Sequence, residues 1–222
     1  MKNWAVLLKK NWDLAIRNNL ILAIAWLLFI PVVRGIANLD AAHSAECLEQ
    51  SVALVGVFLL TPLAGPEQDK RIWETVVSKQ TAYNIILLLR MGMALGCMLT
   101  LILLFGAVMA MSGCRFPFVL YAVGTAATAF ALGGVGLFTA AISRSTVIGY
   151  SAGLGYFLLS LLRVGKNSPV YLFSMSSGIS ANKVWLLGIG AVCFLGAVFC
   201  QWLSEHGRKI SIISHRSEML IL

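Results

Sequence analysis

Six long apolar stretches follow one another along the chain, separated by short polar segments, and they constrain its fold more than any other feature. A helix that crosses the hydrocarbon of a membrane needs about 17–25 mostly apolar residues. The first two stretches are short and borrow flanking residues to reach that length. The pattern predicts an all-α integral membrane protein with six transmembrane helices. The six stretches are Leu20–Val33, Gln50–Ala64, Met91–Met111, Phe118–Ile142, Thr146–Leu162 and Val184–Leu203.

The composition agrees with this prediction. Of the 222 residues, 59% are hydrophobic and 12% are charged, whereas soluble domains are about 45–50% apolar and about 25% charged. The net charge of +8 does not indicate a nucleic-acid partner, because the basic residues form short clusters between apolar stretches. We expect one membrane domain over residues 19–203, with no separately folding soluble domain.

The basic residues predict the orientation, since Lys and Arg concentrate on the cytoplasmic side of membrane proteins. With the N-terminus inside, twelve of the 17 Lys and Arg residues fall in inside segments and five in outside segments. Both termini are therefore expected in the cytoplasm, with residues 204–222 as a cytoplasmic tail. The outside residues are Arg34, Arg115, Arg163, Lys166 and Lys183.

Residues 1–18 have a helical pattern of their own. Trp4, Leu7, Leu8 and Trp12 share one face, and charged residues occupy most of the remaining surface. A basic amphipathic helix with tryptophans suits the headgroup plane of a membrane. The segment is expected to lie along the inner leaflet as an elbow before the first span, or alternatively to extend the first transmembrane helix.

The longest charged inside segment between spans covers residues 65–80. Pro66 suits the first turn of a helix, and Glu67 and Asp69 complement its positive N-terminal end. An apolar stripe that includes Trp73 follows at helical spacing. The pattern predicts a short amphipathic helix, which would either dock into a groove on a partner or rest on lipid headgroups.

No catalytic centre, metal site or cofactor site is expected. The segment Gly149–Gly153 matches the GxSxG pattern of serine hydrolases, but the three histidines of the chain fall in other segments, so Ser151 lacks an expected base. The pair Gly165–Lys166 lacks the flanking residues of a phosphate-binding loop. All nine acidic residues are predicted in loops, termini or helix ends, which argues against an ion-coupled transporter.

Cysteines and glycines carry weaker signals. Cys47 and Cys114 both fall in predicted outside loops, where a disulfide is conceivable. Glycines lie inside the spans, where small residues let helix backbones approach closely, within one chain or across a dimer. They include the pairs Gly92 with Gly96 and Gly149 with Gly153, and the group Gly133, Gly134 and Gly136.

The elbow, the six spans and the segment 65–80 together resemble the permease subunits of type-2 ABC exporters. That family has two glutamates about seven residues apart in its coupling region, a proline about six residues later and a Lys or Arg about ten further on. Glu67, Glu74, Gln80 and Arg90 stand at these spacings. Gln80 departs from the usual proline, and Arg71 departs from the usual glycine. The resemblance covers nearly the whole chain.

The resemblance implies a function and partners. In the family, two permease copies, or two homologous permeases, pair with two ATPase subunits in a bacterial cell membrane. Residues 65–80 would form the coupling helix in an ATPase groove, with Arg144 as a second contact, and the outer connection 164–183 would dip back toward the membrane and could gate the exit. The implied ATPase contacts of the coupling helix are Glu67, Asp69, Arg71, Trp73, Glu74 and Lys79.

The expected function is therefore the transmembrane subunit of an ATP-driven exporter, with ATP hydrolysis on a partner chain and no enzymatic activity of its own. A largely apolar lining favours a hydrophobic or amphipathic substrate, such as a peptide, antibiotic, toxin or lipid, and a haem-linked cargo stays possible. The alternatives are a non-transporting membrane anchor or immunity protein and, with less support, an intramembrane enzyme.

Overall fold

A computed structural model describes residues 9, 11–67, 83–164, 168–178 and 182–219 of the chain. Over these residues every regular element is a helix and no strand occurs. Five helical stretches are long and apolar enough to cross a membrane, and a sixth, Thr146–Leu161, is apolar but shorter. This is the architecture of a multi-pass membrane protein, as the apolar pattern predicts.

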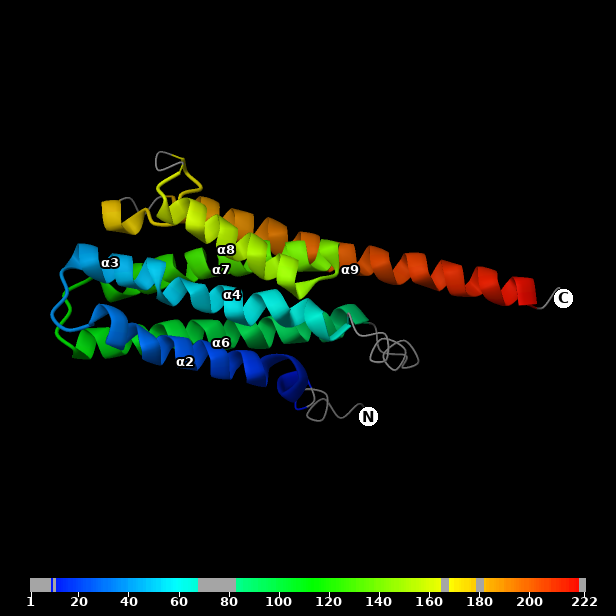
Figure 1. Ribbon diagram of the computed structural model, residues 1–222, viewed down its shortest axis with the longest axis horizontal. Helices are drawn as coiled ribbons and strands as arrows, with labels where there is room; N and C mark the ends of the chain where they lie inside the picture. The colour runs from blue at the N-terminus through cyan, green and yellow to red at the C-terminus, as the bar shows by residue number, and fades with distance from the viewer. Residues whose placement is uncertain (1–8, 10, 68–82, 165–167, 179–181, 220–222) are drawn as a thin grey trace.

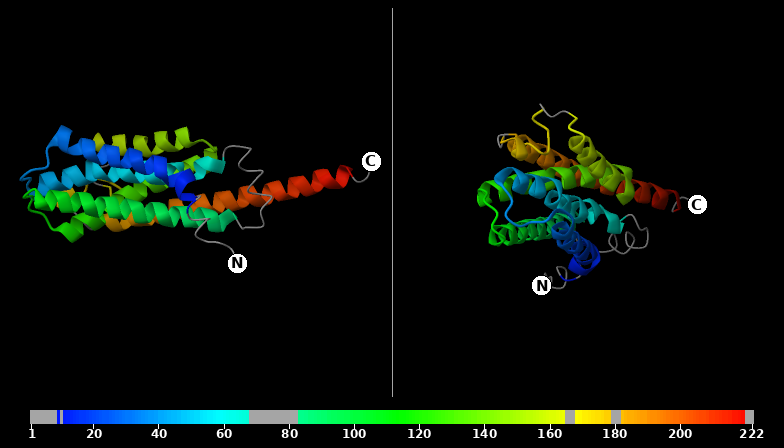
Figure 2. Two further views of the ribbon diagram at one scale, coloured as in Figure 1. Left: turned by 90° about the horizontal axis from the view of Figure 1, so that it is seen from below. Right: turned by 60° about the vertical axis from the view of Figure 1, so that its left-hand side comes forward.

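The helices form an elongated bundle (Figure 1). The ends of the chain lie toward the same end of this bundle, and the connections α2–α3 and α6–α7 lie at the opposite end (Figures 1 and 2). We call the first end the terminal end and the second the connection end. The elements are η1 (Trp12–Ile16), α2 (Arg17–Arg34), α3 (Ala41–Gln50), η2 (Val52–Leu54), α4 (Val55–Leu60), η3 (Thr61–Glu67), α6 (Tyr83–Met111), α7 (Phe118–Ser143), α8 (Thr146–Leu161), η4 (Met175–Ser177) and α9 (Lys183–Met219).

The second span differs most from its sequence-based bounds. It runs from Ala41 to Leu63 through α3, η2, α4 and η3, so it begins nine residues before the predicted Gln50. His43, Glu46 and Glu49 lower the apolar character of its first part and hide it from a hydropathy pattern. This span is 78% buried inside the protein, where neighbouring helices rather than lipid surround it. Its break at Ser51 is stabilised by Trp26, whose Nε1 donates to the Ser51 carbonyl at 2.8 Å.

Helix α7 is the central helix of the bundle and contacts α4, α6, α8 and α9. Its approach to α4 needs glycine on both sides. A Cβ at Gly56 of α4 would collide with the backbone carbonyl of Ala129, and one at Gly133 would lie 2.5 Å from the Gly56 carbonyl oxygen. Backbone contact of this kind is the usual role of small residues between membrane helices.

Glycines also bring α8 and α9 onto α7. A Cβ at Gly149 of α8 would lie 2.6 Å from the carbonyl oxygen of Gly136, and one at Gly134 would lie 3.1 Å from that of Gly190 in α9. The predicted packing role of these glycines within one chain is confirmed. Gly92 and Gly96 of α6 differ, because a Cβ at either would meet nothing within 4 Å. Their pair therefore serves no contact among the described residues.

The α7–α8 turn and the length of α9 are two further features of the bundle. The tight turn between α7 and α8 holds Arg144 in the left-handed region, with φ at +52°. Helix α9 is 37 residues long and extends beyond the rest of the bundle at the terminal end (Figure 1). Its first part, Lys183–Leu203, is apolar enough to span a membrane. The remainder continues as a helix through the stretch predicted to be a cytoplasmic tail.

Candidate functional site

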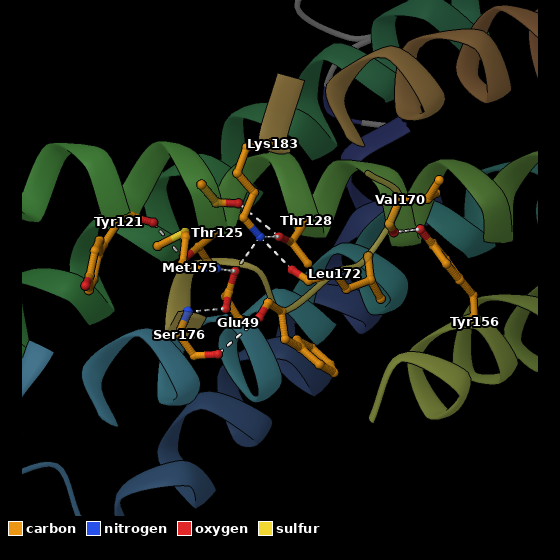
Figure 3. Close-up of polar contacts among 12 residues, drawn as sticks. Glu49, Tyr121, Thr125, Thr128, Tyr156, Val170, Leu172, Met175, Ser176 and Lys183 are labelled. Atoms are coloured by element: carbon orange, nitrogen blue, oxygen red, sulfur yellow. Dashed lines mark hydrogen bonds and ion pairs between the residues drawn. The ribbon is translucent and has the colours of Figure 1, made fainter. Parts of the chain in front are cut away.

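A buried ion pair between Glu49 and Lys183 is the most unusual chemical feature of the described residues. Glu49 is the last but one residue of α3, and Lys183 is the first residue of α9. The two side chains point toward each other beside Thr128 of α7 (Figure 3). Glu49 is fully buried and Lys183 is 6% exposed. We call the Glu49, Lys183 and Thr128 side chains and the backbone groups that they contact the Glu49–Lys183 cluster.

The ammonium group of Lys183 uses all three of its protons within the protein. It forms an ion pair with Glu49 Oε1, donates to Thr128 Oγ1 at 2.8 Å and donates to the carbonyl oxygen of Leu172 at 2.6 Å. Thr128 in turn donates to the carbonyl oxygen of Gly124 at 3.0 Å. A lysine has three donors and no acceptor, so this ammonium is saturated.

The carboxylate of Glu49 is held from a second side. Besides Lys183, it accepts from the backbone N–H of Met175 at 3.1 Å and from that of Ser176 at 3.3 Å (Figure 3). These two amides belong to the first turn of η4, where N–H groups have no partner within the helix. The carboxylate therefore caps η4 and neutralises Lys183 at the same time.

The cluster lies well inside the bundle. Glu49 is about 12 Å along α3 from Ala41, and Thr128 is about 15 Å along α7 from Phe118, at 1.5 Å of rise per residue. Helix α7 has 26 residues and is about 39 Å long, against about 30 Å for the hydrocarbon core of a membrane. The cluster therefore lies about 12–15 Å inward from the starts of α3 and α7, and the surrounding helices enclose it.

Burial makes the free energy of unfolding sensitive to this ion pair. Moving an ion out of water costs several kcal/mol, and a buried partner recovers that cost only when geometry and additional hydrogen bonds are good. Here the pair is neutral overall and four further hydrogen bonds satisfy it. Removal of one partner leaves an uncompensated buried charge, which costs about 3–5 kcal/mol.

The outer connection packs against the same cluster. Residues Tyr171, Leu172, Phe173 and Met175 are buried, and Met175 lies directly on the Cβ-free surface of Gly124 in α7. The Phe173 ring meets the ring of Phe157 in α8 edge-on at 5.5 Å. The described part of the outer connection thus sits between α3, α7 and α8.

The polar groups in and around the outer connection differ in how well they are hydrogen-bonded. The Tyr156 hydroxyl of α8 donates to the carbonyl oxygen of Val170 at 2.6 Å (Figure 3). The Ser174 hydroxyl, in contrast, is 2% exposed and has no hydrogen-bond partner among the described residues. An unsatisfied buried hydroxyl costs about 1–3 kcal/mol. Burial also raises the pKa of the Tyr171 phenol above its ordinary value, so that it stays neutral.

The cluster corrects one expectation from the sequence. All acidic residues were expected in loops, termini or helix ends, and Glu49 does lie near the end of α3, but it is buried inside the second span. The sequence did not show this burial, because Glu49 precedes the apolar stretch that hydropathy detects, while the span starts earlier. A usable signal was present: a Glu and a Lys flank the second and sixth apolar stretches on the same predicted side of the membrane.

A second buried charge lies nearer the terminal end. Arg90 of α6 is 3% exposed, and its Nε donates to Asn11 Oδ1 at 2.7 Å. This contact ties the residues just before η1 to the early part of α6. Arg90 is the basic residue that the family spacing singles out. The contact gives it a place in the fold.

The ATPase contacts implied by the resemblance fall mostly outside the described residues. Asp69, Arg71, Trp73, Glu74 and Lys79 lie in the stretch 68–82, as does most of the coupling helix 65–80, and residues 1–8 and 10 of the elbow 1–18 are likewise undescribed. Glu67 ends η3. Arg144 is exposed in the α7–α8 turn. A Cβ at Gly65 would lie 3.0 Å from Thr146 Cγ2, so the end of the second span lies beside this turn.

The GxSxG pattern Gly149–Gly153 lies within α8. The Ser151 hydroxyl donates to the carbonyl oxygen of Val147 at 3.0 Å, within its own helix. Among the residues that the structure describes, no group of three or more His, Cys, Asp or Glu could hold a metal ion. Cys47 and Cys114 are buried free thiols, and the Cys114 Sγ donates to the Ile36 carbonyl oxygen at 3.1 Å.

Comparison of the chain with protein-family models, with curated proteins and with solved structures finds no match. The function must therefore be argued from the chain itself.

Proposed function

We propose that this chain is the transmembrane subunit of an ATP-driven exporter of the type-2 ABC class, and that a separate polypeptide supplies the ATPase. The observation that carries the proposal is the charged segment 65–80, with Trp73 in its apolar stripe and its loose family spacing. The described residues that flank it support a docking role. Gly65 lies beside Thr146, so the described end of the second span lies next to the turn that contains Arg144.

The state of the buried charges also supports an external energy source. An ion-coupled transporter needs an acidic group in the membrane that can release its proton or bind an ion in turn. Glu49 already accepts from an ammonium and two backbone amides. In this arrangement the carboxylate is occupied by these three donors rather than by an exchangeable proton or ion, which favours transport driven by a partner ATPase.

A groove on the bundle supports a hydrophobic or amphipathic substrate. It lies between α6, α7 and α9, has a volume of about 430 Å³, and only apolar side chains line it. At this depth water is scarce, so an apolar chain or ring system fills such a groove at no desolvation cost. Its lining includes Met98, Ile102, Val123, Ala126, Phe130 and Leu187.

The proposed assembly contains a second permease copy, or a homologous permease, and two ATPase subunits. In it, Trp73 is the apolar anchor in the ATPase groove, because aromatic residues dominate such docking sites and charged residues form their rim. Arg144 makes the second contact. The rim residues are Glu67, Asp69, Arg71, Glu74 and Lys79.

Co-purification tests this proposal directly. The tagged chain is expressed with the ABC ATPase encoded nearest to it, and the detergent-solubilised complex is isolated through the tag. We expect the ATPase to co-purify with the unmodified chain and to be lost with Trp73→Ala combined with Glu74→Ala.

The matched control is Trp185→Ala combined with Asp40→Ala, since both of these residues are exposed and belong to the connection end of the bundle. We expect this variant to retain the ATPase. Failure of the unmodified chain to bind the ATPase would contradict the exporter proposal. A stable complex that supports no ATP-dependent efflux would favour an anchor or immunity protein instead.

A further inference from the structure

We propose that the Glu49–Lys183 ion pair is a latch that holds the outer connection closed over the connection end of the bundle. Separation of the pair lets residues 171–177 move away from α3, α7 and α8. The closed and open arrangements are a property of this chain alone. The statement that opening exposes an exit for substrate rests on the proposed exporter function.

The first support is that both members of the ion pair form hydrogen bonds with the backbone of the outer connection. Glu49 of α3 accepts from the amides of Met175 and Ser176, and Lys183 donates to the carbonyl oxygen of Leu172. The polar contacts of the connection with α3 and α9 thus converge on one ion pair. The ion pair joins these two attachments, so separation of Glu49 from Lys183 weakens the hold on the connection from both sides.

The second support is the place of Lys183 at the start of α9. This helix continues as one rod from Lys183 to Met219 and reaches past the terminal end of the bundle. It packs on α7 through small residues, with Gly190 opposite Gly134. The rings of Phe130 and Phe138 in α7 fill the space beside Gly190 and Gly196, so the two helices are interlocked along this face. Because α9 is one continuous helix, a movement of its part at the terminal end reaches Lys183 at the connection end.

The third support is a feature of the connection that favours opening. The Ser174 hydroxyl is buried without a hydrogen-bond partner among the described residues while the connection is closed. Outward movement gives this hydroxyl access to water. The closed arrangement therefore combines a stabilising ion pair with a destabilising buried hydroxyl. The hydroxyl reduces the free-energy difference between the closed and open arrangements.

Thiol accessibility tests the latch. The five native cysteines are replaced by alanine, Ser174→Cys is introduced as reporter, and the protein is placed in lipid nanodiscs, which leave both membrane faces open to a water-soluble maleimide. With the ion pair intact we expect slow labelling. With Lys183→Met or Glu49→Gln we expect labelling faster by at least about tenfold, since each leaves one buried charge unpaired.

The double variant Glu49→Gln with Lys183→Met is the matched control. It removes both charges together, and the glutamine oxygen can still accept from the η4 amides. We expect its labelling rate to fall below that of either single variant. Val164→Cys, which is exposed in the outer connection, should label quickly in every background. Met98→Cys, which is buried in α6, should stay protected in every background.

Three outcomes would overturn the latch. Fast labelling of Ser174→Cys with the pair intact would show that the connection is not closed. Unchanged protection in both single variants would show that the pair does not hold it. Labelling of Met98→Cys together with Ser174→Cys would show that the pair holds the whole bundle rather than the connection. None of these results depends on an ATPase, so failure of the latch is distinguishable from failure of the exporter proposal.

Discussion

Glu49 and Lys183 show that the effect of a buried charged residue on stability depends on its partner. Neither charge is tolerable alone at this depth, and together they form a neutral, hydrogen-bonded unit. Arg90 is also buried, and its Nε donates to the uncharged Asn11 Oδ1 at 2.7 Å, a hydrogen bond rather than an ion pair. At the residue scale, stability therefore depends on pairs rather than on individual side chains.

The stability of the purified protein should reflect this pairing. We expect Glu49→Gln and Lys183→Met each to lower the free energy of unfolding by about 3–5 kcal/mol, because each leaves an unpaired buried charge. The double variant should lose less than the sum of the two single losses. Thermal unfolding in detergent, followed by the loss of monodisperse protein, measures this double-mutant cycle. Additive losses would mean that the two side chains act independently.

At the scale of elements, α7 is the helix against which the others are packed, and glycine sets the distances. The face of α7 toward α4 and α8 is built from Gly133 and Gly136, and the facing surfaces of those helices carry Gly56 and Gly149. Close backbone contact of this kind increases dispersion attraction between helices, which is the main source of association in lipid.

A single methyl group tests this packing. In Gly56→Ala the added Cβ collides with the carbonyl of Ala129, which is backbone and cannot rotate away, so we expect a loss of about 1–3 kcal/mol. Gly92→Ala is the matched control, since a Cβ there meets nothing within 4 Å. We expect it to change stability by no more than about 0.5 kcal/mol. Thermal unfolding of the two variants compares them directly.

The Gly92 variant carries further information on assembly. A loss of oligomer in size-exclusion chromatography, without a loss of thermal stability, would assign the surface of Gly92 and Gly96 to contact between copies of the chain. Equal destabilisation of Gly56→Ala and Gly92→Ala would contradict the account of α7 as the tightly packed centre.

At the scale of the whole molecule, the helices place both ends of the chain at one end of the bundle and the α2–α3 and α6–α7 connections at the other. This arrangement follows from an even number of crossings. It agrees with the alternation of sides on which the orientation was predicted, but the direction of the bundle in the membrane rests on the distribution of Lys and Arg.

Labelling of intact cells tests that direction. In a background without native cysteines, Asp40→Cys in the exposed α2–α3 connection should react with an impermeant maleimide added outside the cell. Glu67→Cys, at the end of η3, should react only after the membrane is opened, because excess Lys and Arg predicts this side to be cytoplasmic. Reaction of position 67 and protection of position 40 would reverse the proposed topology and move the coupling segment away from any cytoplasmic ATPase.

Prediction from the sequence succeeded where a single effect, the removal of apolar side chains from water, determines the structure of a local segment. Each apolar stretch must lie in lipid or against other helices, so Phe118–Ile142 identifies α7 to within one residue and Met91–Met111 identifies the end of α6, although α6 begins earlier, at Tyr83. The small residues of α7 similarly indicate close packing. The coupling segment and elbow stay predictions, because most of their residues lie outside the described part of the chain.

The start of the second span shows why local prediction fails. Ala41–Glu49 reads as a polar loop, since His43, Glu46 and Glu49 outweigh its apolar residues in any window. The segment is nevertheless a helix inside the bundle, because Lys183 from a distant part of the chain neutralises Glu49. No local pattern contains that information.

The sequence by itself determined that this chain is helical, apolar and built to cross a membrane several times, because transfer of apolar side chains out of water depends on composition along each segment. Only the tertiary structure decided that the outer connection packs between α3, α7 and α8 and that Glu49 and Lys183 meet inside the helix bundle. The physical reason is that a buried charge is stable only beside its partner, and its partner lies more than a hundred residues away in the chain.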